Sequence, residues 1–97
     1  MKAIVIDAVN KRVYPTNIGE YTDYYKHLDC QYFTVVQYPF GDVYVDDEGI
    51  WRDNGFQLPG YHPLFGNGVL TGPVDDEGEN TDVALTIEQV LEMVVWV

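Results

Sequence analysis

The sequence predicts one small α+β domain spanning residues 1–97, with a mainly antiparallel sheet, a short helix after the second strand and a longer C-terminal helix. Three observations predict this class. The chain has 97 residues, the length of one ordinary domain, and its 46% hydrophobic content is enough for a core. Short apolar runs of strand composition alternate with Gly and Pro turns. Two segments carry the spacing of a helix with one packed face.

The first part of the chain contains a predicted strand hairpin followed by a helix. Lys2–Asp7 is an apolar run rich in β-branched residues, which predicts a central strand. Arg12–Thr16 is its predicted partner across a turn around Asn10, and Pro15 places this partner at a sheet edge because proline donates no ladder hydrogen bond. Glu20–Leu28 carries apolar or aromatic residues at positions i, i+3, i+4 and i+7, which predicts a short helix.

The middle of the chain contains strands and a long connection. Two strands are predicted at Tyr32–Tyr38 and Asp42–Asp46, joined by a hairpin turn at Phe40–Gly41. Asp53–Gly68 is expected to be a loop because Gly and Pro interrupt it at short intervals, and its apolar side chains predict that it lies on the core. Val69–Val74 is a further predicted strand, in which a Gly-Pro pair indicates a bulge or an edge position.

The C-terminal segment carries the clearest helix signal. Thr86 and Gln89 have the spacing of a capping box, and apolar residues follow at helical spacing. The end of this helix is expected to be apolar on nearly all sides, either because it is buried or because it contacts another chain. The candidate contacts between two copies in a homodimer are Met93, Trp96 and Val97.

The charge is strongly negative and unevenly distributed. The chain has a formal net charge of -11, and from His27 onward Arg52 is the only cation. Such a surface repels phosphate, which argues against direct binding of nucleic acid or anionic membranes and favours a basic partner, although acidic charge also serves solubility alone. Cys30 is the only cysteine, which excludes an internal disulfide. Because the N-terminus carries no long apolar stretch, we expect a cytoplasmic protein.

One pentad, Val-Asp-Asp-Glu-Gly, occurs twice, at residues 45–49 and 74–78. Because Asp accepts local backbone hydrogen bonds and Gly adopts positive φ, the pentad suits a hairpin turn without any function. As a calcium loop it lacks alternating oxygen ligands and a distal bidentate Glu. A third interpretation is that both turns offer carboxylates to a basic protein surface. The candidate partner-binding residues are Tyr44, Asp46, Asp47, Glu48, Asp75, Asp76, Glu77 and Glu79.

Few residues are suited to catalysis or metal binding. The chain has no serine, so a Ser-His-Asp triad is excluded. Cys30 and His27 form a nucleophile and base only if both project into one cleft, and a lone cysteine is more often a core residue. Two histidines and one cysteine match no zinc spacing, and no glycine-rich phosphate loop is present. The sequence therefore predicts no enzyme, no metal and no cofactor.

Tyrosine is abundant, with eight residues in the chain. Tyrosine supplies rigid, amphipathic contact area and is favoured at interfaces. The other interpretation is that Tyr32, Tyr38 and Tyr44 simply alternate along one face of a sheet.

The chain resembles a family of short, uncharacterised proteins of bacteriophages and mobile elements that share a domain of unknown function. The resemblance rests on residues 1–7 (MKAIVID), residues 41–49 (GDVYVDDEG), and residues 75–79 (DDEGE) leading to the helix start at 85–89 (LTIEQ). Many members carry a Leu-Pro-x-Asn-Arg stretch, whereas residues 58–62 of this chain lack the Asn-Arg pair. The resemblance implies a phage or mobile-element origin, where small acidic proteins often block host defence, and it supplies no catalytic residues.

These observations together predict a counter-defence protein that acts in a bacterial host cell. It is expected to be a stoichiometric inhibitor that occupies a basic, nucleic-acid-binding surface of a host defence complex, such as a CRISPR effector or a restriction enzyme. One alternative is a sponge that sequesters a nucleotide immune signal, although phosphates need cations and the chain has five. The other is a homo-oligomeric accessory module that associates through its C-terminal helix.

Overall fold

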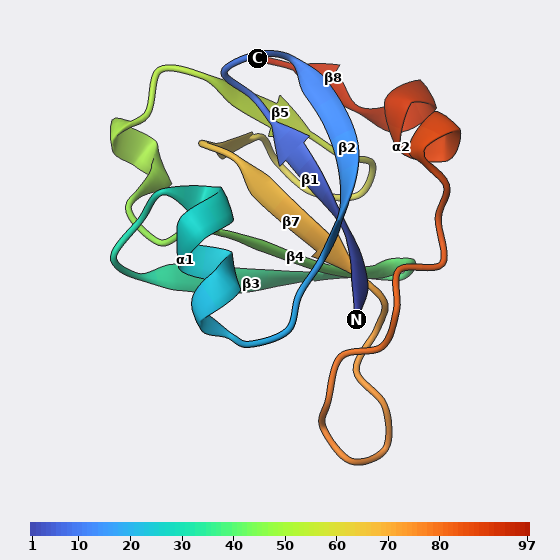
Figure 1. Cartoon of the computed structure of the whole chain (residues 1–97). Helices are drawn as coiled ribbons and strands as arrows, with labels where there is room; N and C mark the ends of the chain where they lie inside the picture. The colour runs from blue at the N-terminus through green and yellow to red at the C-terminus, as the bar shows by residue number, and fades with distance from the viewer.

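The computed structural model describes residues 1–97 and contains a five-stranded sheet in which all neighbours are antiparallel (Figure 1). Its strand order is β2-β1-β7-β4-β3, with β1 Lys2–Asp7, β2 Arg12–Asn17, β3 Phe33–Tyr38, β4 Gly41–Asp46 and β7 Gly68–Thr71. A smaller sheet has the order β6-β5-β8, with β5 Gly55–Gln57, β6 Leu64–Phe65 and β8 Val95–Trp96. The helices are α1 Thr22–Leu28, the 3-10 helix η1 Gly49–Trp51, and α2 Ile87–Met93. The predicted α+β class is confirmed.

The large sheet is buried on both faces, which explains the uninterrupted apolar run in β1. Successive side chains of a strand point to opposite faces of its sheet. Ile4 and Ile6 therefore join the larger core cluster, while Ala3 and Val5 join the smaller one on the other face. All four side chains are at most 2% exposed. The prediction that this strand lies inside the sheet is confirmed, with β2 on one side and β7 on the other.

Each face has its own cover. The larger cluster is completed by Phe56 of β5, Leu64 of β6 and Val90 of α2, so the small sheet and α2 lie on this face. Tyr24 and Leu28 of α1 complete the smaller cluster on the opposite face. The molecule therefore has three layers, with the large sheet between α1 and the second sheet (Figure 1).

Three sequence predictions are wrong in this fold. The loop predicted at 53–68 does pack on the core, but it also forms β5 and β6. The strand predicted at 69–74 ends at Thr71, because the following Gly-Pro pair cannot continue the ladder. The C-terminal helix ends at Met93, and Val97 exchanges backbone hydrogen bonds with Gly55, with N···O distances of 3.0 and 3.1 Å. The β-branched valines after Met93 favour this extended pairing.

The tyrosines do not share one face of the sheet. Tyr38 is buried in the larger cluster, Tyr44 packs on the opposite side, and Tyr32 is exposed before β3 begins. The prediction that these three residues alternate on one face is therefore wrong. The structure gives each of them a different environment.

Candidate functional site

The segment that follows β4 exposes two large apolar side chains among carboxylates. It forms η1, in which the Trp51 N–H donates to the Glu48 carbonyl at 3.1 Å and the Arg52 N–H donates to the Gly49 carbonyl at 2.8 Å. Ile50 and Trp51 are each 81% exposed. Three acidic neighbours are also exposed. We call this surface the η1 face and define it as Asp47, Glu48, Ile50, Trp51 and Asp53.

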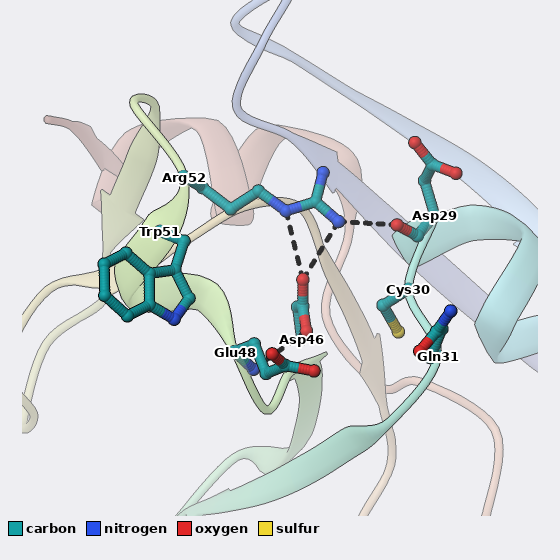
Figure 2. Close-up of a pocket in the computed structure, with 7 residues that line it drawn as sticks. All are labelled: Asp29, Cys30, Gln31, Asp46, Glu48, Trp51 and Arg52. Carbon is teal, nitrogen blue, oxygen red and sulfur yellow. Dashed lines mark hydrogen bonds and ion pairs between the residues drawn. The ribbon is translucent and has the colours of Figure 1, made fainter.

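A partly buried ion pair holds the η1 face in place (Figure 2). The Asp46 carboxylate accepts from Arg52 Nε at 3.0 Å and lies 2.9 Å from Arg52 Nη2. Its other oxygen accepts from the Glu48 N–H at 2.9 Å, and Arg52 Nη2 also donates to the Asp29 carbonyl at 2.5 Å. Asp29 is the C-cap of α1, so the pair ties η1 to that helix. Figure 2 shows the Trp51 indole pointing away from this cluster.

The turn is also anchored from behind. Gly49 lies directly against the carbonyl of Phe65 in β6, so close that a Cβ atom at this position would overlap it. Together with the ion pair, this contact fixes the backbone that carries Ile50 and Trp51. A backbone segment that is ordered before binding loses less entropy in a complex, so this arrangement favours recognition.

A cavity of about 490 Å³ lies beside the ion pair and is lined by Asp29, Cys30, Gln31, Asp46, Glu48, Trp51 and Arg52. Burial raises the pKa of the Cys30 thiol, and the negative charge of Asp46 raises it further. A protonated thiol is a poor nucleophile. His27 lies elsewhere, with Nε2 at 3.2 Å from the Thr16 hydroxyl, and does not line this cavity. The structure therefore does not bring Cys30 and His27 into one cleft, which was the condition for a nucleophile and base pair.

Metal ligands are also dispersed. No group of three or more His, Cys, Asp or Glu side chains has an arrangement that could hold an ion. The Asp46 carboxylate instead bonds to the Glu48 N–H and to Arg52, and the Asp75 carboxylate accepts from backbone N–H groups. The acidic side chains of the η1 face are exposed.

The second pentad forms a hairpin turn, as the sequence predicts. The Asp75 N–H donates to the Glu79 carbonyl at 2.7 Å, and Val74 pairs with Asn80 across the turn. The Asp75 carboxylate accepts from the backbone N–H of both Glu77 and Glu79, and Gly78 has a φ of +83°. Asp76, Glu77 and Glu79 therefore extend into solvent at the tip of a projecting loop, drawn in orange in Figure 1.

The hairpin prediction is wrong for the first pentad. Its Gly49 has no positive φ, and the chain continues through η1 into the other sheet instead of returning beside β4. Asp46 is only 9% exposed, so the sequence-based expectation of an exposed carboxylate is also wrong there. The identical pentads therefore differ in backbone, burial and hydrogen bonding.

The two pentads lie at opposite ends of β4. Asp42 is the second residue of the strand and accepts from Asn80, which follows the second pentad, at 2.9 Å, whereas Asp46 ends the strand. Tyr44 lies between them, stacked on Tyr24 with ring centroids 4.0 Å apart, and its hydroxyl donates to Asn80. Burial raises the pKa of Tyr44. Of the candidate partner-binding residues, Tyr44 and Asp46 thus contact other parts of the chain. The exposed ones are divided between the η1 face and the projecting loop of the second pentad.

Sequence reasoning missed Ile50 and Trp51. The available signal was two large apolar residues directly after an acidic turn, outside any strand or helix period that would bury them. A tryptophan at such a position is exposed unless a distant element covers it. The structure provides no such element.

The candidate oligomer contacts are partly used inside the chain. Met93 and Trp96 are half-buried and pack against the larger core cluster. Val97 remains 45% exposed, and the neighbouring Val95 is 56% exposed. The apolar C-terminal end is therefore partly a cover for the core of this chain.

Comparisons with known proteins give one match. Residues 1–95 match DUF3846, a domain of unknown function. No curated protein and no solved structure matches the chain. No helix in the structure has the length and apolar character needed to cross a membrane. Because the match extends over nearly all of the sequence, the chain belongs to the DUF3846 family of uncharacterised domains.

Proposed function

We propose that this protein is a binding protein without catalytic activity, and that its η1 face occupies a basic, nucleic-acid-binding surface of another protein. The expected partner is a host defence complex such as a CRISPR effector or a restriction enzyme, and the expected origin is a phage or mobile element. The observation that carries the proposal is Trp51, which is 81% exposed on an anchored turn among carboxylates.

Charge and shape support this choice together. Interface hot spots are enriched in tryptophan, and a tryptophan on an anchored backbone contributes apolar area without the cost of first ordering that backbone. The acidic neighbours of Trp51 lie on a chain with a net charge of -11, which speeds the encounter with a basic surface. Acidic charge that served solubility alone would not require an exposed indole at its centre.

The distribution of cations disfavours the nucleotide sponge. Three of the five cations are already paired, in Arg12–Asp7, Lys26–Asp23 and Arg52–Asp46, at 2.9, 3.6 and 2.9 Å. Only Lys2 and Lys11 form no ion pair with an acidic side chain. A phosphate site needs converging cations or backbone donors. We therefore favour the protein partner.

Competition with DNA tests the proposal. Purified CRISPR effector and restriction enzyme would each be bound to fluorescent DNA, and displacement of the DNA by this protein would be followed by anisotropy. We expect displacement that weakens with salt, because exposed charges are screened beyond about 8 Å at physiological ionic strength. Trp51→Ala should raise the Kd about tenfold or more, the effect of losing a hot-spot aromatic.

A matched pair of charge reversals supplies the control. Asp47→Lys with Glu48→Lys changes the η1 face, and Asp76→Lys with Glu77→Lys makes the same change of charge on the projecting loop. We expect only the first pair to lower the association rate by about tenfold, because attraction acts mainly near the contact. Equal effects of both pairs, or no effect of Trp51→Ala, would refute the role of the η1 face. Failure to displace DNA from either complex would refute the proposed partner class.

A further inference from the structure

The strand β3 is an unprotected edge of the large sheet. It is the last strand in the order β2-β1-β7-β4-β3. Its six residues, Phe-Thr-Val-Val-Gln-Tyr, carry no charge and no proline, and they pair with β4 in an unbroken register without a bulge. Natural proteins protect edge strands with charges, prolines, bulges or covering segments, because an open edge pairs with other chains.

The register shows which backbone groups are free. In an antiparallel pair, every second residue exchanges hydrogen bonds with the neighbouring strand, and the residues between point their N–H and C=O groups outward. The Asp47 N–H donates to the Tyr32 carbonyl at 2.9 Å, in line with the register of β3 against β4. By alternation, the outward groups on β3 belong to Phe33, Val35 and Gln37.

The opposite edge of the same sheet is protected. Met1 and Ile18 exchange hydrogen bonds of 2.8 and 3.1 Å, so by the same alternation Pro15 occupies an outward position on β2. Proline has no N–H to offer at that position. One edge of the sheet therefore lacks a central donor, while the other edge offers three donors and three acceptors.

An apolar groove runs beside the free edge. It has a volume of about 410 Å³, and one wall is formed by Thr34, Val35 and Val36 of β3 together with Val45 and Asp46 of β4. The other wall comes from the segment 61–65 and from Ile50 of the η1 face. Exposed apolar side chains line it, namely Val35, Ile50, Tyr61 and Phe65. A strand added to β3 could place alternate side chains in this groove, which is how strand addition gains specificity.

We propose that an extended segment of the basic partner adds to β3 as a sixth, antiparallel strand, with apolar side chains at alternate positions and Lys or Arg at its C-terminal end. Antiparallel pairing is the arrangement of every neighbouring pair of strands in this sheet. In antiparallel pairing, the C-terminal end of the added strand lies beside Phe33, where Asp47 and Glu48 of the η1 face are exposed. A second copy of this chain fits less well, because two chains of net charge -11 repel each other.

The inference rests on the proposed function, because it names the part of the basic partner that is bound. A capped synthetic peptide in which Val and Thr alternate over six positions before Lys-Lys-Arg is the probe. Titration followed by NMR should show slowed amide exchange at Phe33, Val35 and Gln37, whose N–H groups point away from β4 and have no strand partner in the free protein. The amides of Thr34 and Val36 should be protected both with and without the peptide, since they donate to β4.

Two matched controls separate strand addition from charge attraction. A peptide with the same side chains, N-methylated at the backbone nitrogens that would face β3, should bind at least tenfold more weakly. A peptide with the basic residues moved to the N-terminal end should also bind more weakly. Val35→Pro, which removes the central outward N–H as Pro15 does on β2, should weaken binding of the first peptide by about tenfold, whereas Val35→Thr keeps the N–H and should bind normally.

Each result decides a different point. Equal binding of the methylated and unmethylated peptides would overturn strand addition and leave the acidic η1 face as the binding site. Absence of binding by either peptide at millimolar concentration would overturn the proposed strand site, while the DNA-displacement assay would still test the η1 face. Protection of Phe33, Val35 and Gln37 without peptide, together with a dimeric mass, would show that a second copy occupies the edge.

Discussion

Asp46 and Asp47 are adjacent carboxylates that the structure places in opposite environments. The variants Asp46→Asn and Asp47→Asn therefore test whether the ion pair between Asp46 and Arg52 anchors the η1 segment. Asp46 is buried and bonded to Arg52, whereas Asp47 is exposed. Both substitutions remove one negative charge and keep the side-chain shape. Any effect of net charge on stability is therefore common to both variants.

The expected difference follows from the contacts. The Asp46 carboxylate accepts two hydrogen bonds, one from the Glu48 N–H and one from Arg52 Nε, and it forms an ion pair with Arg52 Nη2. A bond to a charged group contributes about 1 kcal/mol more than a neutral one, and an asparagine amide also turns an N–H toward one of these donors. Because the Arg52 side chain is 35% exposed, solvent weakens the pair, and we expect Asp46→Asn to cost about 2 kcal/mol.

Equilibrium unfolding in urea, followed by both tryptophan fluorescence and far-UV circular dichroism, measures the two free energies. Asp47→Asn should stay within about 0.5 kcal/mol of the wild type, as exposed substitutions usually do. In a domain of this size, a loss of 2 kcal/mol lowers the Tm by roughly 8–16 °C. If both variants unfold within about 0.5 kcal/mol of each other, the ion pair does not anchor the η1 segment and our account of its rigidity is wrong.

Two further predictions concern Asp7 and the pentad glycines. Burial alone would raise the pKa of the Asp7 carboxyl, but hydrogen bonds from Asn10 and the ion pair with Arg12 outweigh it and hold that pKa below its usual value. The resulting stability is present above the unfolded-state pKa of about 3.9 and is lost as pH falls below it. Asp7→Asn should therefore reduce the loss of stability at acid pH that urea unfolding measures. An unchanged dependence of the unfolding free energy on pH would contradict this. Gly78→Ala should cost about 1–2 kcal/mol of stability because Gly78 has a positive φ. Gly49→Ala should cost more, because the new Cβ would overlap the backbone carbonyl of Phe65. The reverse order of the two costs in urea unfolding would refute these structural roles of the two glycines.

Local sequence patterns were sufficient to predict the elements whose structure depends mainly on their own residues. The apolar run of β1 predicts a central strand, and the structure places it inside the large sheet, between two core clusters. The spacing in Glu20–Leu28 predicts α1, and the Thr86 capping box forms with both of its hydrogen bonds. Pro15 predicts an edge strand because a proline cannot donate to a ladder wherever it lies.

Short apolar runs could not be assigned in the same way. β5, β6 and β8 have three, two and two residues, which is too few for a period to distinguish strand from helix or loop. Val95–Trp96 becomes a strand because β5 offers hydrogen-bond partners at that point. The free edge of β3 is likewise a property of the strand order, which no local pattern contains.

The repeated pentad shows where local sequence stops determining structure. Both copies are Val-Asp-Asp-Glu-Gly, and the sequence favours a hairpin turn for both. The second copy forms one because Pro73 and Thr81 lie in a returning chain whose hydrogen bonds close the loop. The first copy meets Arg52 and the backbone of Phe65, which draw Asp46 inward and leave Ile50 and Trp51 exposed. Sequence thus determined which residues could form a turn. Contacts with distant residues determined which carboxylates were buried and which apolar side chains were left in solvent. Burial depends on what the rest of the chain brings to the same place, and a local pattern does not contain that information.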